Sequence, residues 1–143
     1  MTYAPRSRSA RATGSYASIG LETEILSASP ERLISLLFRG ALTSIAQAKH
    51  HLHAGNIAER GKALSKAINI IDSGLKAGVD TERGGEVARL LIASYELIIR
   101  DLMSANLHSD ADKLAAAEKQ LADLADAWYT ATDPQFKQPS STG

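Results

Sequence analysis

The chain lacks cysteine among its 143 residues, so it forms no disulfide and offers no thiolate ligand to a metal. Aromatic residues make up only 5% of it, which favours helices over sheet. Neither sign of charge is in excess, since Lys plus Arg equals Asp plus Glu at 16 each. We therefore expect no nucleic-acid partner. No apolar run approaches the roughly 20 residues that span a bilayer, so we expect no membrane insertion and a cytoplasmic location.

What the sequence does contain is a set of helix start and stop signals. Ser29 is a good N-cap residue, and Pro30 after it suits the first helical position. Gly55 ends that helix, and Asn56 with Glu59 three residues later forms a cap-like start for a second one. A connection of about two residues predicts an antiparallel hairpin.

The second half of the chain carries similar signals. Residues 78–85 form a loop that contains glycine, Ser109 begins the last helix, and Asp133-Pro134 ends it. Four helices of roughly 20 residues with short connections predict an all-α fold, an antiparallel up-down four-helix bundle with an N-terminal lid segment or short extra helix. The four predicted helices span about residues 30–54, 57–77, 86–105 and 109–132.

Composition divides the chain into three parts. Residues 1–15 are rich in Arg, Ser and Ala and are expected to form a disordered arm. Residues 16–132 form the bundle domain, in which 16–27 are apolar enough to cover it as a lid. Residues 133–143 are a polar tail.

Two of the predicted helices are apolar on more than one face. In segment 57–77 a seam runs from Ile57 through Leu64 to Leu75, with a shallower stripe beside it. In segment 86–105 the predicted core stripe is Val87, Leu90, Leu91, Ser94, Leu97, Ile98 and Leu102. The second stripes comprise Ala63, Ala67, Ile70 and Gly74 in the first of these segments and Ala88, Ile92, Tyr95, Ile99 and Met103 in the other.

This apolar surface exceeds what a four-helix core should bury. Burial of Ile70, Ile92, Ile99 and Met103 is worth on the order of 6–12 kcal/mol before association costs. Three interpretations remain open on pattern alone. The second stripes bind an apolar helix of a partner, or the segment 16–26 covers them permanently, or they form a homodimer contact.

No pattern in the sequence points to catalysis, a cofactor or a metal. His50 and His53 share a helical face, but two imidazoles alone hold a metal weakly. Gly84-Gly85 lacks the following Lys-Ser/Thr and the preceding strand of a phosphate loop. We therefore expect no catalytic, cofactor-binding or metal-binding residues, and a protein that is not an enzyme.

Several separate motifs resemble one family. Tyr16 stands upstream of a Ser-Pro motif, and Gly84–Ala88, Ser104–Leu107 and Ala125–Trp128 follow in the order that the family has. The longest matching stretches are Ser27–Ala41 (SASPERLISLLFRGA) and Gly61–Val79 (GKALSKAINIIDSGLKAGV). From about Tyr16 to Trp128 the chain thus resembles the FliS family of flagellar export chaperones, which bind flagellin. Arg39 departs from the pattern, because the family often has an acidic residue before the equivalent of Gly40.

The resemblance implies a function. Such chaperones hold the C-terminal segment of flagellin in the cytoplasm, prevent its premature polymerisation and assist its delivery to the flagellar type III export apparatus. A lid gives way to flagellin, and an export-gate component is a further candidate partner. A monomer or weak homodimer is expected, and the alternative is a helical adaptor or dimerisation bundle without an export substrate. The inferred flagellin-binding residues are Tyr16, Ala63, Ala67, Ile70, Gly74, Ala88, Ile92, Tyr95, Ile99 and Met103.

Overall fold

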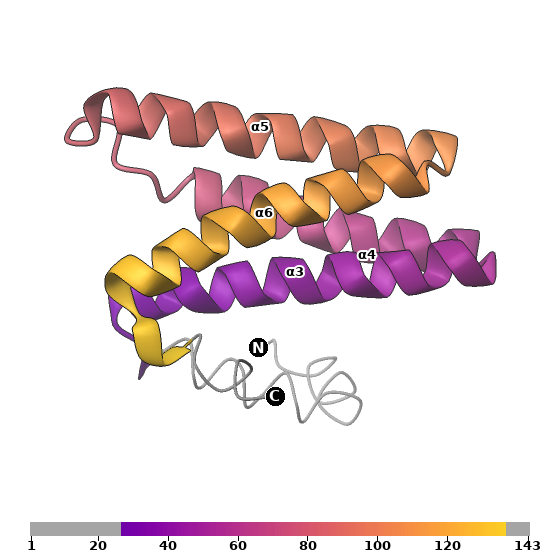
Figure 1. Cartoon of the computed structure of the whole chain (residues 1–143), viewed down its shortest axis with the longest axis horizontal. Helices are drawn as coiled ribbons and strands as arrows, with labels where there is room; N and C mark the ends of the chain where they lie inside the picture. Colours follow the sequence, from indigo (N-terminus) through magenta and orange to yellow (C-terminus); the bar gives the residue numbers. More distant parts are fainter. Residues whose placement is uncertain (1–26, 137–143) are drawn as a thin grey trace, which may run out of the picture.

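The computed structural model describes residues 27–136 of the chain, and all regular secondary structure in that range is helical. They are α3 (Pro30–Ala54), α4 (Ile57–Asn69), the π-helix η1 (Ile70–Lys76), α5 (Gly85–His108) and α6 (Ala111–Thr132). Since η1 follows α4 without a break, the described part forms four rods (Figure 1), as the sequence predicts. The predicted arm, nearly all of the predicted lid and residues 137–143 lie outside the described range.

The ends of α3 confirm the cap signals read from the sequence. The Ser29 side chain accepts a hydrogen bond from the Arg32 backbone N–H at 3.1 Å. At the other end Gly55 takes a left-handed conformation with φ 77°, and its N–H donates to the carbonyls of His51 and Leu52. Only two residues separate α3 from α4, so the two helices form the antiparallel hairpin that the short connection predicts.

Two other cap predictions are wrong. Asn56 precedes α4 but its side chain makes no cap hydrogen bond, because it turns back to within 3.4 Å of the His51 ring. Ser109 is not the cap of α6. It ends α5 in a left-handed conformation with φ 52°, and the next residue, Asp110, accepts from the Lys113 N–H at 3.0 Å. A carboxylate at this position also favours the positive end of the helix dipole.

The second rod is not a regular α-helix along its whole length. The seven residues of η1 form a π-helical stretch, a wider turn that is common at functional sites. Within it, Gly74 lies so close to α3 that an added Cβ would be 3.2 Å from the Leu37 methyl groups. Glycine therefore allows α3 and η1 to approach each other here.

Each helix packs against its neighbours in the sequence, and the first described helix also packs against the last. The helix α3 packs against α4, η1 and α6, whereas α5 packs against α6, η1 and α4. Figure 1 shows that α6 begins beside the end of α5 and runs at an angle across the bundle to the start of α3. The core draws on all of the rods and consists of Phe38, Ala41, Ile45, Ala48, Ala63, Leu64, Ala67, Ile71, Leu75, Tyr95, Ile98, Leu102, Ala105, Leu114, Ala117, Leu121 and Ala125.

The predicted assignment of core and second stripes on α5 and α4 is partly wrong. On α5 the expected core residues Val87, Leu90 and Leu97 are 72%, 60% and 40% exposed. Ala88 and Tyr95, expected in the second stripe, are buried instead. The reason is the course of α6, which leaves α5 towards α3 and so leaves one flank of the first half of α5 uncovered.

A similar correction applies to α4. Ile57, expected at the head of the seam, is 67% exposed, whereas Ala63 and Ala67 of the second stripe are buried. Small side chains on this face suit a close helix contact, because they let two backbones approach. The surplus of apolar surface is therefore present in the structure, but it is concentrated on a different flank from the one expected.

Candidate functional site

The described part contains an apolar pocket of about 520 Å³. It lies where α5 and α6 diverge, with the end of η1 and the start of α3 as its other walls. Nearly all of its lining is apolar, a composition typical of sites that bind hydrophobic side chains. The lining residues are Ile34, Phe38, Leu75, Gly78, Val79, Asp80, Gly84, Val87, Ala88, Leu91, Tyr95, Leu124, Ala127, Trp128, Ala131 and Thr132.

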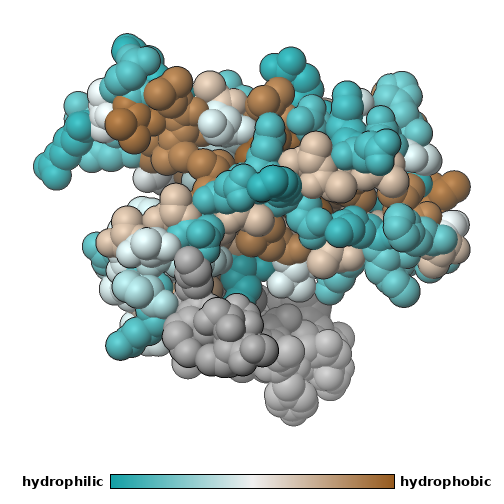
Figure 2. Space-filling view, viewed as in Figure 1, coloured by the Kyte–Doolittle hydropathy of each residue, from teal (hydrophilic) through white to brown (hydrophobic). Residues whose placement is uncertain are grey.

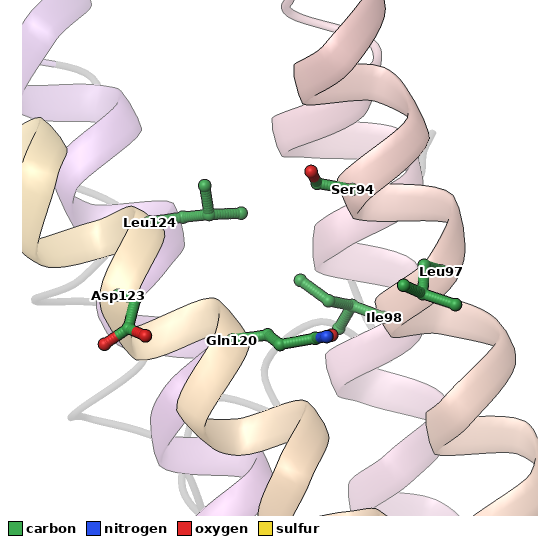
Figure 3. Close-up of a pocket in the computed structure, with 6 residues that line it drawn as sticks. All are labelled: Ser94, Leu97, Ile98, Gln120, Asp123 and Leu124. Carbon is green, nitrogen blue, oxygen red and sulfur yellow. The ribbon is translucent and has the colours of Figure 1, made fainter.

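A smaller hollow of about 250 Å³ continues along the same two helices. Figure 3 shows Leu124 and Gln120 of α6 pointing across the gap towards Ser94 and Ile98 of α5, with Asp123 turned away. Leu124 lines both hollows, so they adjoin each other between α5 and α6, and we call the two together the α5–α6 groove.

The rim of the groove on the α5 side is also apolar. Val87 lines the larger pocket and is 72% exposed, and Leu97 lines the smaller one and is 40% exposed. Leu90 lines neither, but it is 60% exposed and helical spacing puts it between them on the same face of α5. Figure 2 shows apolar surface gathered over the first half of α5. Contiguous apolar surface of this kind marks protein-interaction sites more often than scattered apolar residues do.

Aromatic side chains form the floor of the groove. Phe38 and Tyr95 are 2% and 3% exposed, and their ring centroids lie 6.4 Å apart. Burial raises the pKa of Tyr95 to about 12, since the phenolate is disfavoured away from water. Burial also raises the pKa of Tyr129, whose ring meets Phe38 edge-on at 6.3 Å. The floor is therefore aromatic and apolar, and its tyrosines keep their protons at neutral pH.

The loop at the open end of the groove is held by its own hydrogen bonds. The Asp80 carboxylate accepts from the backbone N–H groups of Glu82 and Arg83, both at 3.1 Å. The Gly84 N–H donates to the Asp80 carbonyl at 2.9 Å, and an added Cβ at Gly84 would be only 2.8 Å from that oxygen. This tight turn brings Gly84 and Ala88 to the pocket wall.

Other kinds of site have no support within residues 27–136. That range contains no group of three or more His, Cys, Asp or Glu arranged to hold a metal ion. The rings of His50 and His51 contact each other edge to face at the exposed end of α3. None of the described helices is both long enough and apolar enough to span a bilayer.

The structure separates the residues predicted to bind flagellin into groups. Tyr16 lies outside the described range. Met103 is 57% exposed, on the part of α5 beyond the groove lining. Four are in the core, Ala63, Ala67, Ala88 and Tyr95. The remaining four, Ile70, Gly74, Ile92 and Ile99, are half-buried. Only Ala88 and Tyr95 line the larger pocket, so the predicted set does not form one surface, and its contact with a partner stays a prediction.

Sequence reasoning missed the residues that form the groove walls. Val87 and Leu97 were expected in the core, and Trp128 was named as the end of a family motif. Helical periodicity finds the apolar arc of α5 but does not say which edge of the arc the next helix covers. The one signal available was Ser94, a polar residue in the middle of the expected core stripe, which lines the smaller hollow.

Fold and site together define a class, an antiparallel helical bundle with an open apolar groove. The family model described as "Flagellar protein FliS" matches residues 12–135. The Flagellar secretion chaperone FliS of Salmonella typhimurium (strain LT2) is 47% identical, over 79% of this chain and 84% of that protein. The Escherichia coli (strain K12) protein of the same name is 39% identical, over 83% and 88%. Flagellar secretion chaperone FliSB of Pseudomonas aeruginosa is 36% identical, over 82% and 93%.

The chain therefore belongs to the FliS family of flagellar secretion chaperones. This confirms the family resemblance read from the motifs and the all-α bundle expected with it. The family is one of chaperones rather than enzymes.

Proposed function

We propose that this protein binds the C-terminal segment of flagellin in the cytoplasm, prevents its premature polymerisation and assists its delivery to the flagellar type III export apparatus. Membership of the chaperone family supports the class of function. The single observation that supports a binding surface is the α5–α6 groove, about 520 Å³ in its larger part and rimmed by exposed Val87 and Leu90. An amphipathic segment that places apolar side chains at helical spacing fits such a groove.

The proposal includes the predicted lid. Residues 16–26 carry five large apolar side chains, Tyr16, Ile19, Leu21, Ile25 and Leu26. They lead into α3, whose residue Ile34 lines the larger pocket. The lid then covers apolar surface of the free chaperone and gives way when flagellin binds. The cost of displacing it lowers the apparent affinity for flagellin.

A calorimetric titration tests the proposal. The full chain is titrated with a peptide of the flagellin C-terminal segment, and saturable binding with a Kd of tens of micromolar or tighter is expected. Leu90→Asp adds a charge to the groove rim and should weaken binding at least about tenfold, because the carboxylate loses water when the peptide docks. Absence of saturable binding by the unaltered chain contradicts the proposal.

Leu107→Asp is the matched control. Leu107 is 77% exposed on the same helix, but it lies about two and a half turns beyond Ile98, the last residue of α5 that lines the groove. The same chemical change should leave the affinity unchanged. Circular dichroism of both variants checks that each remains folded. Equal weakening by the two substitutions places the binding surface elsewhere.

Oligomeric state separates this proposal from a helical adaptor that dimerises through its apolar flank. We propose a monomer or weak homodimer, with an export-gate component as a further partner of the loaded chaperone. Light scattering of the free chain and of the chain with excess flagellin peptide distinguishes the two. A stable dimer that the peptide does not dissociate supports the adaptor.

A further inference from the structure

The end of α6 is tied to the start of α3 by a chain of hydrogen bonds that no motif in the sequence indicates. Asp133, directly after α6, accepts from Arg32 Nε at 2.7 Å and from Arg32 Nη2 at 3.0 Å. Two parallel bonds of this kind fix the orientation of both groups. The Asp133 side chain is only 12% exposed, so solvent screens the pair less than a surface ion pair. Figure 1 shows the two helix ends side by side.

The same carboxylate reaches the groove through one buried hydroxyl. Ser35 Oγ, on a fully buried residue, lies 3.0 Å from Asp133 Oδ2 and 3.2 Å from the carbonyl oxygen of Glu31. Trp128 Nε1–H donates to Ser35 Oγ at 3.1 Å. A hydroxyl has one proton to donate, and a carboxylate is a stronger acceptor than a carbonyl. The bonds therefore run from Trp128 through Ser35 to Asp133. We call these four residues the Asp133 network (Arg32, Ser35, Trp128 and Asp133).

Phe136 holds the turn that carries Asp133. Its ring centroid lies 5.0 Å from the Arg32 guanidinium carbon and 4.6 Å from that of Arg39. It also lies 5.2 Å from the ring of Tyr129. Cations over an aromatic face are attracted to its negative charge distribution. Arg39, the basic residue before Gly40 that was singled out in the sequence, thus has a contact in the fold.

The position of this network relative to the groove gives it a role in binding. Trp128 is one wall of the larger pocket, and Ile34, next to Ser35 on α3, is part of another. An indole held by a hydrogen bond presents one fixed apolar face, whereas a released indole samples several rotamers. Only the conformers with an open pocket accept a partner, so the apparent affinity scales with their population.

We propose that Asp133 is a positioning residue of the α5–α6 groove, which fixes the Trp128 indole through Ser35 and thereby raises the affinity of the groove for an apolar partner segment. The inference rests on the proposed function, since it assigns the partner segment to this groove. It differs from a purely structural role of the ion pair, because it requires the link through Ser35.

The chain offers a direct readout, since Trp128 is its only tryptophan. We expect Asp133→Asn to increase acrylamide quenching of Trp128 fluorescence and to raise the Kd for the flagellin C-terminal peptide. The expected rise is about threefold to tenfold, the factor that ~0.7–1.4 kcal/mol gives at 25 °C. Glu118→Gln is the matched control. It neutralises the carboxylate of another α3–α6 ion pair, with Lys49 at 2.8 Å, and should change neither the quenching nor the Kd.

Ser35→Ala distinguishes positioning from mere attachment. It removes the link to Trp128 but leaves both Arg32–Asp133 hydrogen bonds in place. If Asp133 positions Trp128 through Ser35, Ser35→Ala should raise quenching and Kd as much as Asp133→Asn does. The double variant should then bind the peptide no more weakly than either single variant. Additive effects, or an unchanged quenching constant in Asp133→Asn, overturn the inference.

An apolar dye separates this inference from the proposed function. Binding of 8-anilinonaphthalene-1-sulfonate is measured on the same variants, since the dye binds exposed apolar surface. If the unaltered chain binds the dye but not the peptide, the proposed function fails. In that case weaker dye binding by both Asp133→Asn and Ser35→Ala still supports the positioning of Trp128, and unchanged dye binding overturns it.

Discussion

The two halves of the bundle, α3 with α4 and α5 with α6, differ in how much of their apolar surface is exposed. The α3–α4 hairpin is closed, with buried alanines on both helices and Gly74 against Leu37 just beyond it. The α5–α6 pair is open, because α6 leaves α5 towards α3 and Val87 and Leu90 stay exposed on the flank it leaves. In the sequence, each half has one helix with a second apolar stripe. The difference shows that helix direction contributes to where this protein keeps accessible apolar surface.

The largest expected effect is on the free energy of unfolding, and it is tested by truncating one apolar side chain in each half. Ile45→Ala removes a side chain that is 0% exposed on α3 and should lower the free energy of unfolding by about 2–5 kcal/mol. Leu90→Ala, at a residue 60% exposed on α5, should change it by less than about 0.5 kcal/mol. Urea unfolding of both variants gives the two values. Similar losses in both would mean that the flank of α5 is covered in solution.

The pH dependence of stability tests whether the groove floor is dry. The pKa of Tyr95 is about 12 in the folded chain against an ordinary 10, so the folded state holds its proton more tightly. This contribution to stability is complete below pH 10 and is lost as the pH rises from 10 to 12. Its full size is about 2–3 kcal/mol.

The measurement compares the unaltered chain with Tyr95→Phe, which has no hydroxyl to ionise. Urea unfolding at pH 9 and near pH 11.5 should show a steeper loss of stability in the unaltered chain, because lysines titrate equally in both. Parallel pH profiles would mean that water reaches the Tyr95 hydroxyl.

A substitution in the loop at the open end of the groove should have a smaller effect. In Gly84→Ala the new Cβ would be 2.5 Å from the Ala88 Cβ and 2.8 Å from the Asp80 carbonyl oxygen. The backbone must shift to relieve this, which we expect to cost about 1–3 kcal/mol in unfolding free energy. Thermal unfolding measures the loss, with Ala93→Gly at an exposed position of α5 as a helix-propensity reference of about 1 kcal/mol. A stabilised Gly84→Ala variant would contradict the close contact.

The smallest expected effect on stability comes from the residues that precede α3 and α4, the two helices of the closed half. Ser29→Ala removes the cap hydrogen bond to the Arg32 N–H and should cost about 1 kcal/mol. Asn56→Ala should cost less than half of that, because the Asn56 side chain makes no cap bond to α4. Differential scanning calorimetry at matched concentration measures both. An equal loss in the two variants would restore the capping role that the sequence suggested for Asn56.

Much of the fold could be predicted because its signals are local. Ser29, Pro30 and Gly55 mark the ends of α3 through contacts within a few residues, and the structure has them there. The cap of α6 was misplaced by one residue because both Ser109 and Asp110 are good cap residues, and only the backbone decides between them. The π-helical stretch of η1 has no local signature that periodicity detects.

The sequence predicts a surplus of apolar surface, but it does not predict that this surface lies between α5 and α6. Ala88 and Tyr95 were assigned to the second stripe and Val87 to the core, and the structure reverses both. The Asp133 network joins residues about 100 positions apart, so no short-range pattern contains it.

The helices, the up-down bundle, the family and the surplus of apolar surface follow from the amino-acid sequence alone, because each depends on short-range spacing or on motifs. That this surface opens between α5 and α6, with Trp128 hydrogen-bonded to Ser35 beside it, follows only from how the helices pack. Exposure depends on the angle at which a neighbouring helix crosses. Packing of the whole chain sets that angle, and no single segment encodes it.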